Sequence, residues 1–346
     1  MAKALYKDFE SRITGNGATG VAAKLDVPDP TDAQLLKTYE MFNRSMLKTN
    51  FFKEDIGAIG YRLDPAVFLG QQKLPEIPFG IFHLVGRDFN GFHVRFRDIS
   101  RGGIRMILST KDNYERNRMT QFQENYGLAY TQKLKNKDIT ESGSKGTVLL
   151  RQGRGGMSKN HQGEYAFMQY IDTLLDLMLE TEGVSSIYTE PEYLFFGPDE
   201  NTAPLMDPAA YYTQKKGYGP WRSITTGKSG TLGGIPHDTY GMTTRSVRQF
   251  VQGVQRKLGH KQSEKTKFVT GGPDGDLGSN EVILGEETIV GIVDGSGVIY
   301  DPEGLDRDAL LQLCDQRVMV NNYKGKFSDG GFFIGVDETN RTLPDG

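Results

Sequence analysis

The chain is long enough for about two domains and carries little net charge. It has 346 residues, of which 37% are hydrophobic and 25% charged, and its formal net charge is −3. It contains no basic block, which argues against nucleic-acid binding, because phosphate affinity needs clustered Lys and Arg. Its longest apolar stretches are well below the roughly 18 residues of a membrane span. Neither a nucleic acid nor a membrane is therefore an expected partner.

The cysteine content and the N-terminus indicate a reducing compartment. The single cysteine, Cys314, excludes a disulfide or a cysteine-based zinc site within one chain. The N-terminal stretch MAKALYKDFESR contains acids and lacks a long apolar core, so it does not resemble a secretory signal. We expect a cytoplasmic protein, with a mitochondrial location as the alternative.

Strands and helices are predicted to alternate along the chain. We expect residues 1–30 to be poorly ordered. Helical spacing of apolar residues predicts helices over 31–50, after Ser109, over 164–182 and over 243–258. The last helix has an apolar face made of Val247, Phe250, Val251 and Val254. Asn90 and Gly91 form a dipeptide typical of hairpin turns, here between two strands. This alternation predicts an α/β fold.

A glycine-rich run late in the chain has the pattern of a dinucleotide half-site. FVTGGPDGDLGSNE, residues 268–281, reads as a strand end, a tight turn and a helix start, and IVGIVD follows and ends at Asp294. Glycines let the backbone approach a pyrophosphate at a helix N-terminus, and the acid can hold the ribose hydroxyls. The predicted cofactor residues are Gly271, Gly272, Gly275, Asp276, Gly278, Ser279 and Asp294.

The run departs from the usual GxGxxG pattern, whose first glycine would fall on Pro273. Taken alone, it therefore also fits an ordinary surface turn. As a nucleotide site it favours NAD over NADP, because Asp294 would repel a 2′-phosphate and no Arg or Lys lies between Val290 and Tyr300. Only about 50 residues follow Asp294, whereas a full dinucleotide domain needs roughly 100. We therefore expect an incomplete Rossmann-like domain and a chain that is a fragment.

Cations and glycines gather between residues 101 and 146. RGGIR, residues 101–105, is followed by Lys133 and by GSKG around Lys145. Cations that meet in one pocket bind carboxylates and lower one another's pKa, which can give a lysine that is neutral near pH 7. The alternative is that they are solvated surface charges.

Asp199 and the His237–Asp238 pair are two further candidates for chemistry. Asp199 lies in FFGPDEN, where a strand passes into a loop, so it is either a catalytic acid or a Pro-Asp turn residue. His237 precedes Asp238, but no set of His, Cys and carboxylate residues has metal-ligand spacing, and no GxSxG elbow is present. We expect no metal.

These residues together resemble the active site of the glutamate dehydrogenases. FHVRFRDISRGGIR, EPEYLFFGPDEN, GGIPHDTYGMT and TGGPDGDLGSNE are similar to the large, NAD-specific class of that family, and VGIVDGSGVIYDPEGLD resembles the wider family. The resemblance covers roughly residues 31 to 346. It implies a substrate-binding and catalytic domain over 1–240 and an NAD-binding domain, truncated at its C-terminus, over 241–346.

The resemblance also implies roles for individual residues. Lys145 matches the catalytic lysine, and Asp199 matches the carboxylate that carries protons to and from the amine. Lys133 matches the lysine for the substrate α-carboxylate. Arg101 stands where most members have a lysine for the distal carboxylate, and Thr243 matches a threonine near the nicotinamide and the substrate. The implied reaction is NAD-dependent oxidative deamination of L-glutamate to 2-oxoglutarate and ammonia, and the implied assembly is a homo-oligomer.

Departures from the family pattern leave two alternatives open. Arg101 keeps the charge of the usual lysine and adds a bidentate fork that suits a carboxylate. Tyr130 stands where many relatives use a polar amide, and Ser142 replaces a glycine. One alternative is a non-catalytic fragment that acts as a binding or interaction module. The other is a dehydrogenase of an apolar amino acid, which Arg101 argues against because the cation would have no partner.

Overall fold

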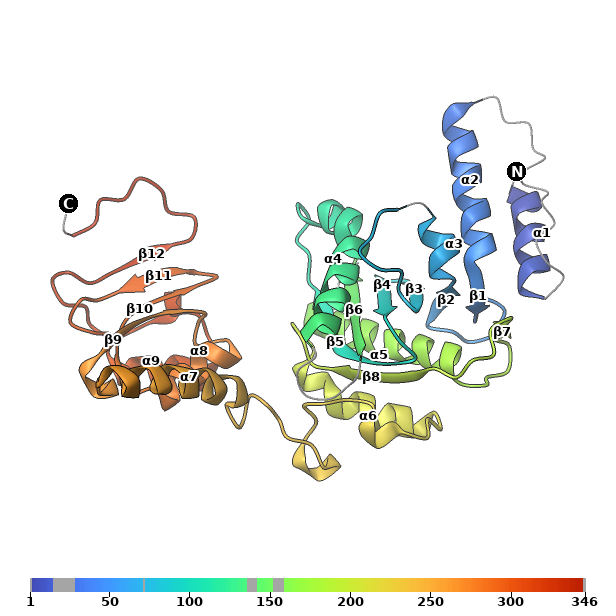
Figure 1. The fold of residues 1–346 in the computed structure, drawn as a ribbon. Coiled ribbons are helices and arrows are strands. Elements are labelled where there is room, and N and C mark those ends of the chain that lie inside the picture. Colours follow the sequence, from blue (N-terminus) through green and yellow to red (C-terminus); the bar gives the residue numbers. More distant parts are fainter. Residues whose placement is uncertain (1, 15–28, 71, 136–141, 152–158, 345–346) are drawn as a thin grey trace. The chain divides into compact units, whose positions relative to one another are not determined.

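The chain forms two compact units, Met1–Gly234 and Ile235–Gly346. The structure is a computed structural model that describes residues 2–14, 29–70, 72–135, 142–151 and 159–344 (Figure 1). The boundary lies shortly before the one expected at residue 240. In the part of the chain that is described, no helix has the length and apolar character needed to span a bilayer.

The first unit is built on an eight-stranded mixed sheet in the order β7-β1-β2-β3-β4-β6-β5-β8. Neighbours from β7 to β6 are antiparallel, whereas β5 runs parallel to both β6 and β8. The strands are β1 (Met46–Thr49), β2 (Ala58–Leu63), β3 (Gly80–Gly86), β4 (Phe89–Arg95), β5 (Ile99–Ile107), β6 (Ser142–Leu150), β7 (Ser185–Ser186) and β8 (Tyr193–Gly197). The helices are α1 (Ala2–Ile13), α2 (Pro30–Ser45), α3 (Pro65–Leu69), α4 (Tyr114–Lys135), α5 (Lys159–Met178) and α6 (Met206–Lys215).

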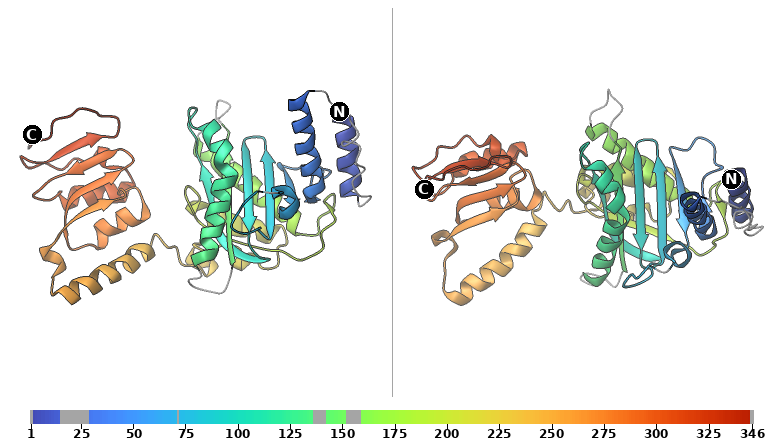
Figure 2. Two further views of the ribbon diagram at one scale, coloured as in Figure 1. Left: turned by 45° about the horizontal axis from the view of Figure 1, so that its top comes forward. Right: turned by 90° about the horizontal axis from the view of Figure 1, so that it is seen from above.

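Helices α4 and α5 cover opposite faces of this sheet (Figure 2). A Cβ added to Gly143 would meet the backbone of α4, and one added to Gly146 would meet Tyr170 of α5. Because side chains alternate along a strand, residues 143 and 146 point to opposite faces. The α5 side holds the larger apolar core, which includes Phe167, Ile171 and Leu174 from the helix predicted over 164–182.

Three local expectations for the first unit are wrong. Residues 2–13 form helix α1, which packs against α2, while residues 15–28 lie outside the described residues. Helix α2 ends at Ser45, and β1 follows where the helix was expected to continue. The hairpin turn lies at Arg87 and Asp88, between β3 and β4. Gly91 instead lies within β4, where an added Cβ would be 2.8 Å from the Tyr170 ring, so packing explains this glycine.

The second unit, Ile235–Gly346, combines one sheet with the helices α7, α8 and α9. Its four-stranded sheet has the order β12-β11-β10-β9, with only β9 and β10 parallel. The predicted strand, glycine turn, helix and second strand are confirmed as β9, the loop over 271–275, α8 and β10. The bounds are α7 (Met242–Leu258), β9 (Thr266–Thr270), α8 (Asp276–Leu284), β10 (Thr288–Asp294), β11 (Gly297–Tyr300), α9 (Arg307–Gln316) and β12 (Phe332–Gly335).

Helix α7 turns Arg248 inward, although an apolar stripe is typical of a buried helix face. The four predicted apolar residues are exposed, and Phe250 is 77% exposed. Thr244 and Arg248 are buried instead. Arg248 donates to Glu281 of α8 at 2.8 Å and to Glu287 at 3.1 Å. Ion pairs therefore attach α7 to its unit, and its apolar stripe faces away from this contact.

Candidate active site

The parallel strands β5 and β6 bring the predicted substrate cations onto one face of the sheet. Arg101 of β5 is the register partner of Gly143 of β6. Because side chains of register partners share a face, Arg101 lies on the same face as Gly143 and as Lys145, two residues further along. Helix α4, which carries Lys133, covers this face. Arg101, Lys133 and Lys145 are therefore neighbours, although 44 positions separate the first from the last.

Two glycines allow the surrounding elements to approach this closely. A Cβ at Gly143 would lie 2.1 Å from the backbone nitrogen of Lys133, so only glycine lets α4 pack against β6 here. A Cβ at Gly103 would lie 3.0 Å from the Cβ of Asp199. The glycines of the RGGIR and GSKG motifs therefore position Lys133 and Asp199.

Lys145 and Asp199 are in direct contact. The Lys145 ammonium donates to Oδ2 of Asp199, and the two side chains are 12% and 18% exposed. Asp199 follows β8 and is fixed by local bonds. Its backbone N–H donates to Oγ1 of Thr202 at 2.9 Å, and its Oδ1 accepts from the backbone N–H of Glu200 at 2.7 Å. The carboxylate is therefore held toward the lysine.

The surroundings of Lys145 change its pKa. Burial lowers the pKa of Lys145 to about 8, and the positive charges of Arg105 and Lys135 act in the same direction, while Glu124 opposes them. The Asp199 carboxylate also favours the charged form, because an opposite charge in contact stabilises it. A lysine with this pKa is partly neutral near neutral pH, as a general base or a hydrogen-bonding catalyst must be.

Lys133 already has a carboxylate partner in the structure. Its ammonium donates to Glu76, from the segment between α3 and β3, and lies 5.6 Å from the centre of the Phe96 ring. Tyr126 of α4 holds this segment, since its hydroxyl donates to the Glu76 carbonyl at 2.8 Å. The sequence analysis missed Glu76. Tyr130, flagged above as a departure, packs in the same aromatic group, with its ring 5.7 Å from that of Phe96.

The glycine loop of the second unit has a tight geometry around Asp294. Gly271 has a φ of 110°, which favours glycine. A Cβ at Gly278 would lie 2.2 Å from the carbonyl oxygen of Gly272, and one at Gly272 would lie 2.5 Å from Oδ2 of Asp294. The loop after β9 and the carboxylate at the end of β10 therefore meet, as in the pattern that predicted a pyrophosphate and ribose site.

The other predicted cofactor residues, Gly275, Asp276 and Ser279, lie at the start of α8. Gly275 is the N-cap of α8, and Asp276 begins the helix. Thr243 of α7 lies beside Asp276, with Oγ1 and Oδ2 3.4 Å apart. Burial, and next the Asp238 carboxylate, raise the pKa of Asp276. Ser279 is buried inside the unit, so its side chain faces away from solvent.

Arg317 is a residue of this loop region that the sequence analysis did not identify. Its guanidinium binds both carboxylate oxygens of Asp238 at 2.7 Å and donates to the Gly275 carbonyl at 3.2 Å. Asp238 therefore acts as an anchor for the segment before α7. Among the described residues, no group of His, Cys, Asp and Glu side chains could hold a metal ion.

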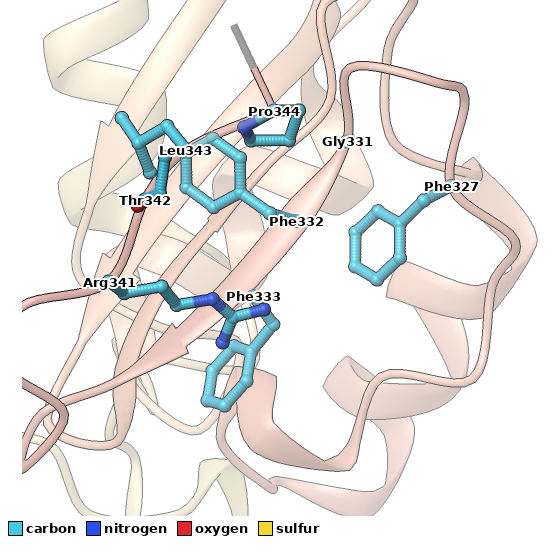
Figure 3. A pocket seen from close by; sticks show the side chains of 8 residues that line it. All are labelled: Phe327, Gly331, Phe332, Phe333, Arg341, Thr342, Leu343 and Pro344. Carbon is cyan, nitrogen blue, oxygen red and sulfur yellow. The ribbon is translucent and has the colours of Figure 1, made fainter. Parts of the chain in front are cut away.

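The pockets described on each unit do not coincide with these residues. One pocket, of about 540 Å³, lies beside β12. Figure 3 shows Phe332 next to Leu343 and Pro344, with Phe327 across from them. A pocket of about 660 Å³ at the end of α5 includes Lys48 and Tyr188, and a third lies over Phe268 and Tyr300. None of the predicted site residues lines these three pockets.

Comparisons with known proteins identify the relatives of this chain. It is 46% identical to glutamate dehydrogenase 2 of Dictyostelium discoideum over 364 aligned residues, covering 100% of the chain and 34% of the relative. It is also 46% identical to the NAD-specific glutamate dehydrogenase of Saccharomyces cerevisiae, covering 92% of the chain and 30% of the relative. The chain is related to NAD-specific glutamate dehydrogenases. The resemblance predicted from its motifs is confirmed.

Two further comparisons bear on the family and the fold. Residues 233–339 match the family model described as Glutamate/Leucine/Phenylalanine/Valine dehydrogenase. A solved glutamate dehydrogenase of Plasmodium falciparum is 15% identical, with a TM-score of 0.50, and the match covers 96% of this chain and 65% of that one. This match supports the α/β fold alone. The chain spans about a third of the length of the curated relatives it matches.

Proposed function

We propose that the protein takes part in NAD-dependent oxidative deamination of L-glutamate to 2-oxoglutarate and ammonia. The observation that supports this most directly is the contact between Lys145 and Asp199 on the face that also carries Arg101 and Lys133. These residues lie in a chain 46% identical to relatives named NAD-specific glutamate dehydrogenase. In this proposal the substrate is a dicarboxylate, which matches the two further cations beside the pair.

Arg101 and Lys133 bind and orient the substrate in the proposed reaction. The Arg101 fork suits bidentate binding of the distal carboxylate, and Lys133 binds the α-carboxylate in place of Glu76. Holding both ends of the substrate fixes its Cα–H and its amino group, which is the positioning part of catalysis. An apolar amino acid has no distal carboxylate for the Arg101 fork to bind.

Lys145 and Asp199 carry the proton chemistry. Lys145, with its lowered pKa, activates the water that attacks the iminium carbon and stabilises the oxyanion that develops. Asp199, in contact with Lys145, takes protons from and returns them to the nitrogen. Burial of both side chains strengthens these interactions, because a low dielectric screens charges less than water does.

The glycine loop is the proposed NAD site. The close approach of Gly272 to both Gly278 and Asp294 leaves no room for a side chain, which suits a backbone cradle for a pyrophosphate. Asp294 would bind the ribose hydroxyls while keeping its bonds from the backbone N–H groups of Ser296 and Val320, both at 2.8 Å. The loop and Asp294 would hold NAD, which would supply the hydride acceptor for the reaction at the substrate Cα.

Formation of NADH from L-glutamate and NAD, followed by absorbance, tests the proposal. It should be measured for this chain and for a version extended to the length of its relatives. Turnover in either version that is lost on changing Asp199 to Asn supports the assignment. Two folded versions that neither turn over nor bind NADH would contradict it and favour the non-catalytic module.

Assembly and location stay predictions. Gel filtration of the extended version tests the expected homo-oligomer, and fractionation of cells tests a cytoplasmic against a mitochondrial location.

A further inference from the structure

Arg105 contacts carboxylates from two different elements at the candidate site. It lies two residues beyond Gly103 on β5 and therefore on the same face of the sheet. Its Nη1 is 3.0 Å from Oε1 of Glu124 on α4, and its Nε is 3.6 Å from Oδ1 of Asp199. Its Nε also lies 3.7 Å from the more exposed Glu200 carboxylate. The guanidinium thus bridges α4 and the loop after β8.

The two oxygens of Asp199 are divided between the two cations. Oδ2 contacts Lys145, whereas Oδ1 faces Arg105 and accepts a bond from the Glu200 N–H. A planar guanidinium donates along several fixed directions, whereas an ammonium is a compact point charge. Arg105 can therefore face Glu124 and Asp199 at once, a geometry that a lysine at this position would reproduce only in part.

We propose that Arg105 is a positioning residue for the Lys145–Asp199 pair. It holds one oxygen of Asp199 away from Lys145, and Glu124 fixes its guanidinium from the other side. Lys145 then shares the carboxylate with a second cation instead of forming a closed ion pair. This arrangement keeps Lys145 able to release its proton, and its consequence for turnover rests on the proposed function.

The charges around Lys145 support the proposal and determine the direction in which the pKa of Lys145 should move when Arg105 is lost. Asp199 and Glu124 favour the charged ammonium, whereas Arg105, Lys135 and burial disfavour it. Loss of Arg105 removes a positive neighbour and also removes its ion-pair contact with Oδ1 of Asp199, so Lys145 no longer shares the carboxylate charge with it. Both changes strengthen the hold of Lys145 on its proton, so the pKa of Lys145 rises from about 8 toward its ordinary value.

The direct test is the pH dependence of Lys145 acetylation by limiting acetic anhydride, read by mass spectrometry. Only the neutral amine reacts, so the pH at the midpoint of the acetylation profile reports the protonation of Lys145. This readout does not depend on whether the chain turns over glutamate. We expect the midpoint to rise by about one pH unit or more in Arg105→Gln, which is about a tenfold loss of reactivity at pH 7. Arg105→Lys should restore part of the shift.

Two further variants keep the test decisive. Arg118→Gln removes an exposed arginine of α4 that pairs with Glu115, and should leave the midpoint unchanged. Glu124→Gln removes a negative neighbour and should move the midpoint down, opposite to Arg105→Gln. An unchanged midpoint in a folded Arg105→Gln protein, or shifts of the same sign in both site variants, would overturn the proposal.

Turnover separates this inference from the proposed function. If the wild-type protein forms NADH, the acidic limb of its kcat profile should move up in Arg105→Gln together with the acetylation midpoint, with a smaller change in KM. If the wild type is inactive but the midpoints move as expected, the proposed function fails and the positioning role of Arg105 stands.

Discussion

Two clusters of ion pairs use the same kinds of residue to opposite effect. In the first unit, Lys145 and Arg105 share Asp199, and burial lowers the pKa of Lys145 to about 8. In the second unit, Arg248 and Lys267 share Glu281 and Glu287. Burial alone would raise the pKa of Glu287, but its hydrogen bonds and the charges of Lys267 and Arg248 lower it to about 2.

The direction of each shift separates a reactive site from a structural one. The lowered pKa of Glu287 favours its charged form. The pKa of Arg248 is raised, because the charges of Glu287 and Glu281 outweigh the effect of burial, and this shift also favours the charged form. The Lys145 shift favours the neutral form, despite a carboxylate in contact. Perturbed groups of the second kind are candidates for catalysis, and those of the first kind for stability.

The largest expected effect comes from breaking the first cluster at Asp199. Asp199→Asn keeps the size of the side chain but removes the base, so kcat should fall by about 10²–10⁴-fold while KM for glutamate changes little. Steady-state NADH formation measures this. Glu115→Gln, which removes an exposed carboxylate on α4, is the matched control. Unchanged turnover in Asp199→Asn would remove this residue from the mechanism.

Breaking the second cluster should affect stability and not chemistry. Glu287→Gln leaves Arg248 and Lys267 with one carboxylate fewer inside the unit, which should cost about 3–5 kcal/mol of unfolding free energy, as for other broken buried pairs. Urea unfolding measures this loss. Glu264→Gln breaks the exposed pair with Lys261 and should cost about 0–1 kcal/mol.

The pH dependence of the stability lost in Glu287→Gln tests whether this loss is electrostatic. The folded pKa of Glu287 lies below its ordinary value of 4.5, so its contribution to stability is present above pH 4.5 and is lost as the pH falls toward about 2. The stability difference between the wild type and Glu287→Gln should therefore shrink over this range. A difference that stays constant across it would point to lost packing instead.

The pH dependence of turnover gives an effect of intermediate size. Below the Lys145 pKa of about 8 the ammonium is protonated, and each further pH unit lowers the neutral fraction about tenfold. The value of kcat/KM for glutamate should therefore rise with pH, reach half its maximum near pH 8 and level off above it. A profile that is flat from pH 6 to 8 would show that neutral Lys145 is not required.

The same comparison shows what the sequence could and could not predict. The motif resemblance named Lys145 and Asp199 as candidates, and strand register and glycine positions explain why the two residues meet. The contact between Arg105 and Asp199 was missed because it joins β5 to a loop 94 residues later. The orientation of α7 could not be read from the sequence, because an apolar stripe is typical of a buried face, whereas the ion pairs of Arg248 decide which side of the helix meets α8.

The smallest effect concerns Glu76, the carboxylate that Lys133 holds in this structure. A substrate carboxylate bound at Lys133 must displace Glu76, so Glu76→Gln should lower KM for glutamate. The two side chains are 32% and 40% exposed, and such pairs contribute about 0.2–1 kcal/mol, so a decrease of at most about fivefold is expected. Initial rates at varied glutamate measure it, with Glu115→Gln as the control. A higher KM would instead show that Glu76 orients Lys133 toward the substrate, because loss of a competitor can only tighten binding.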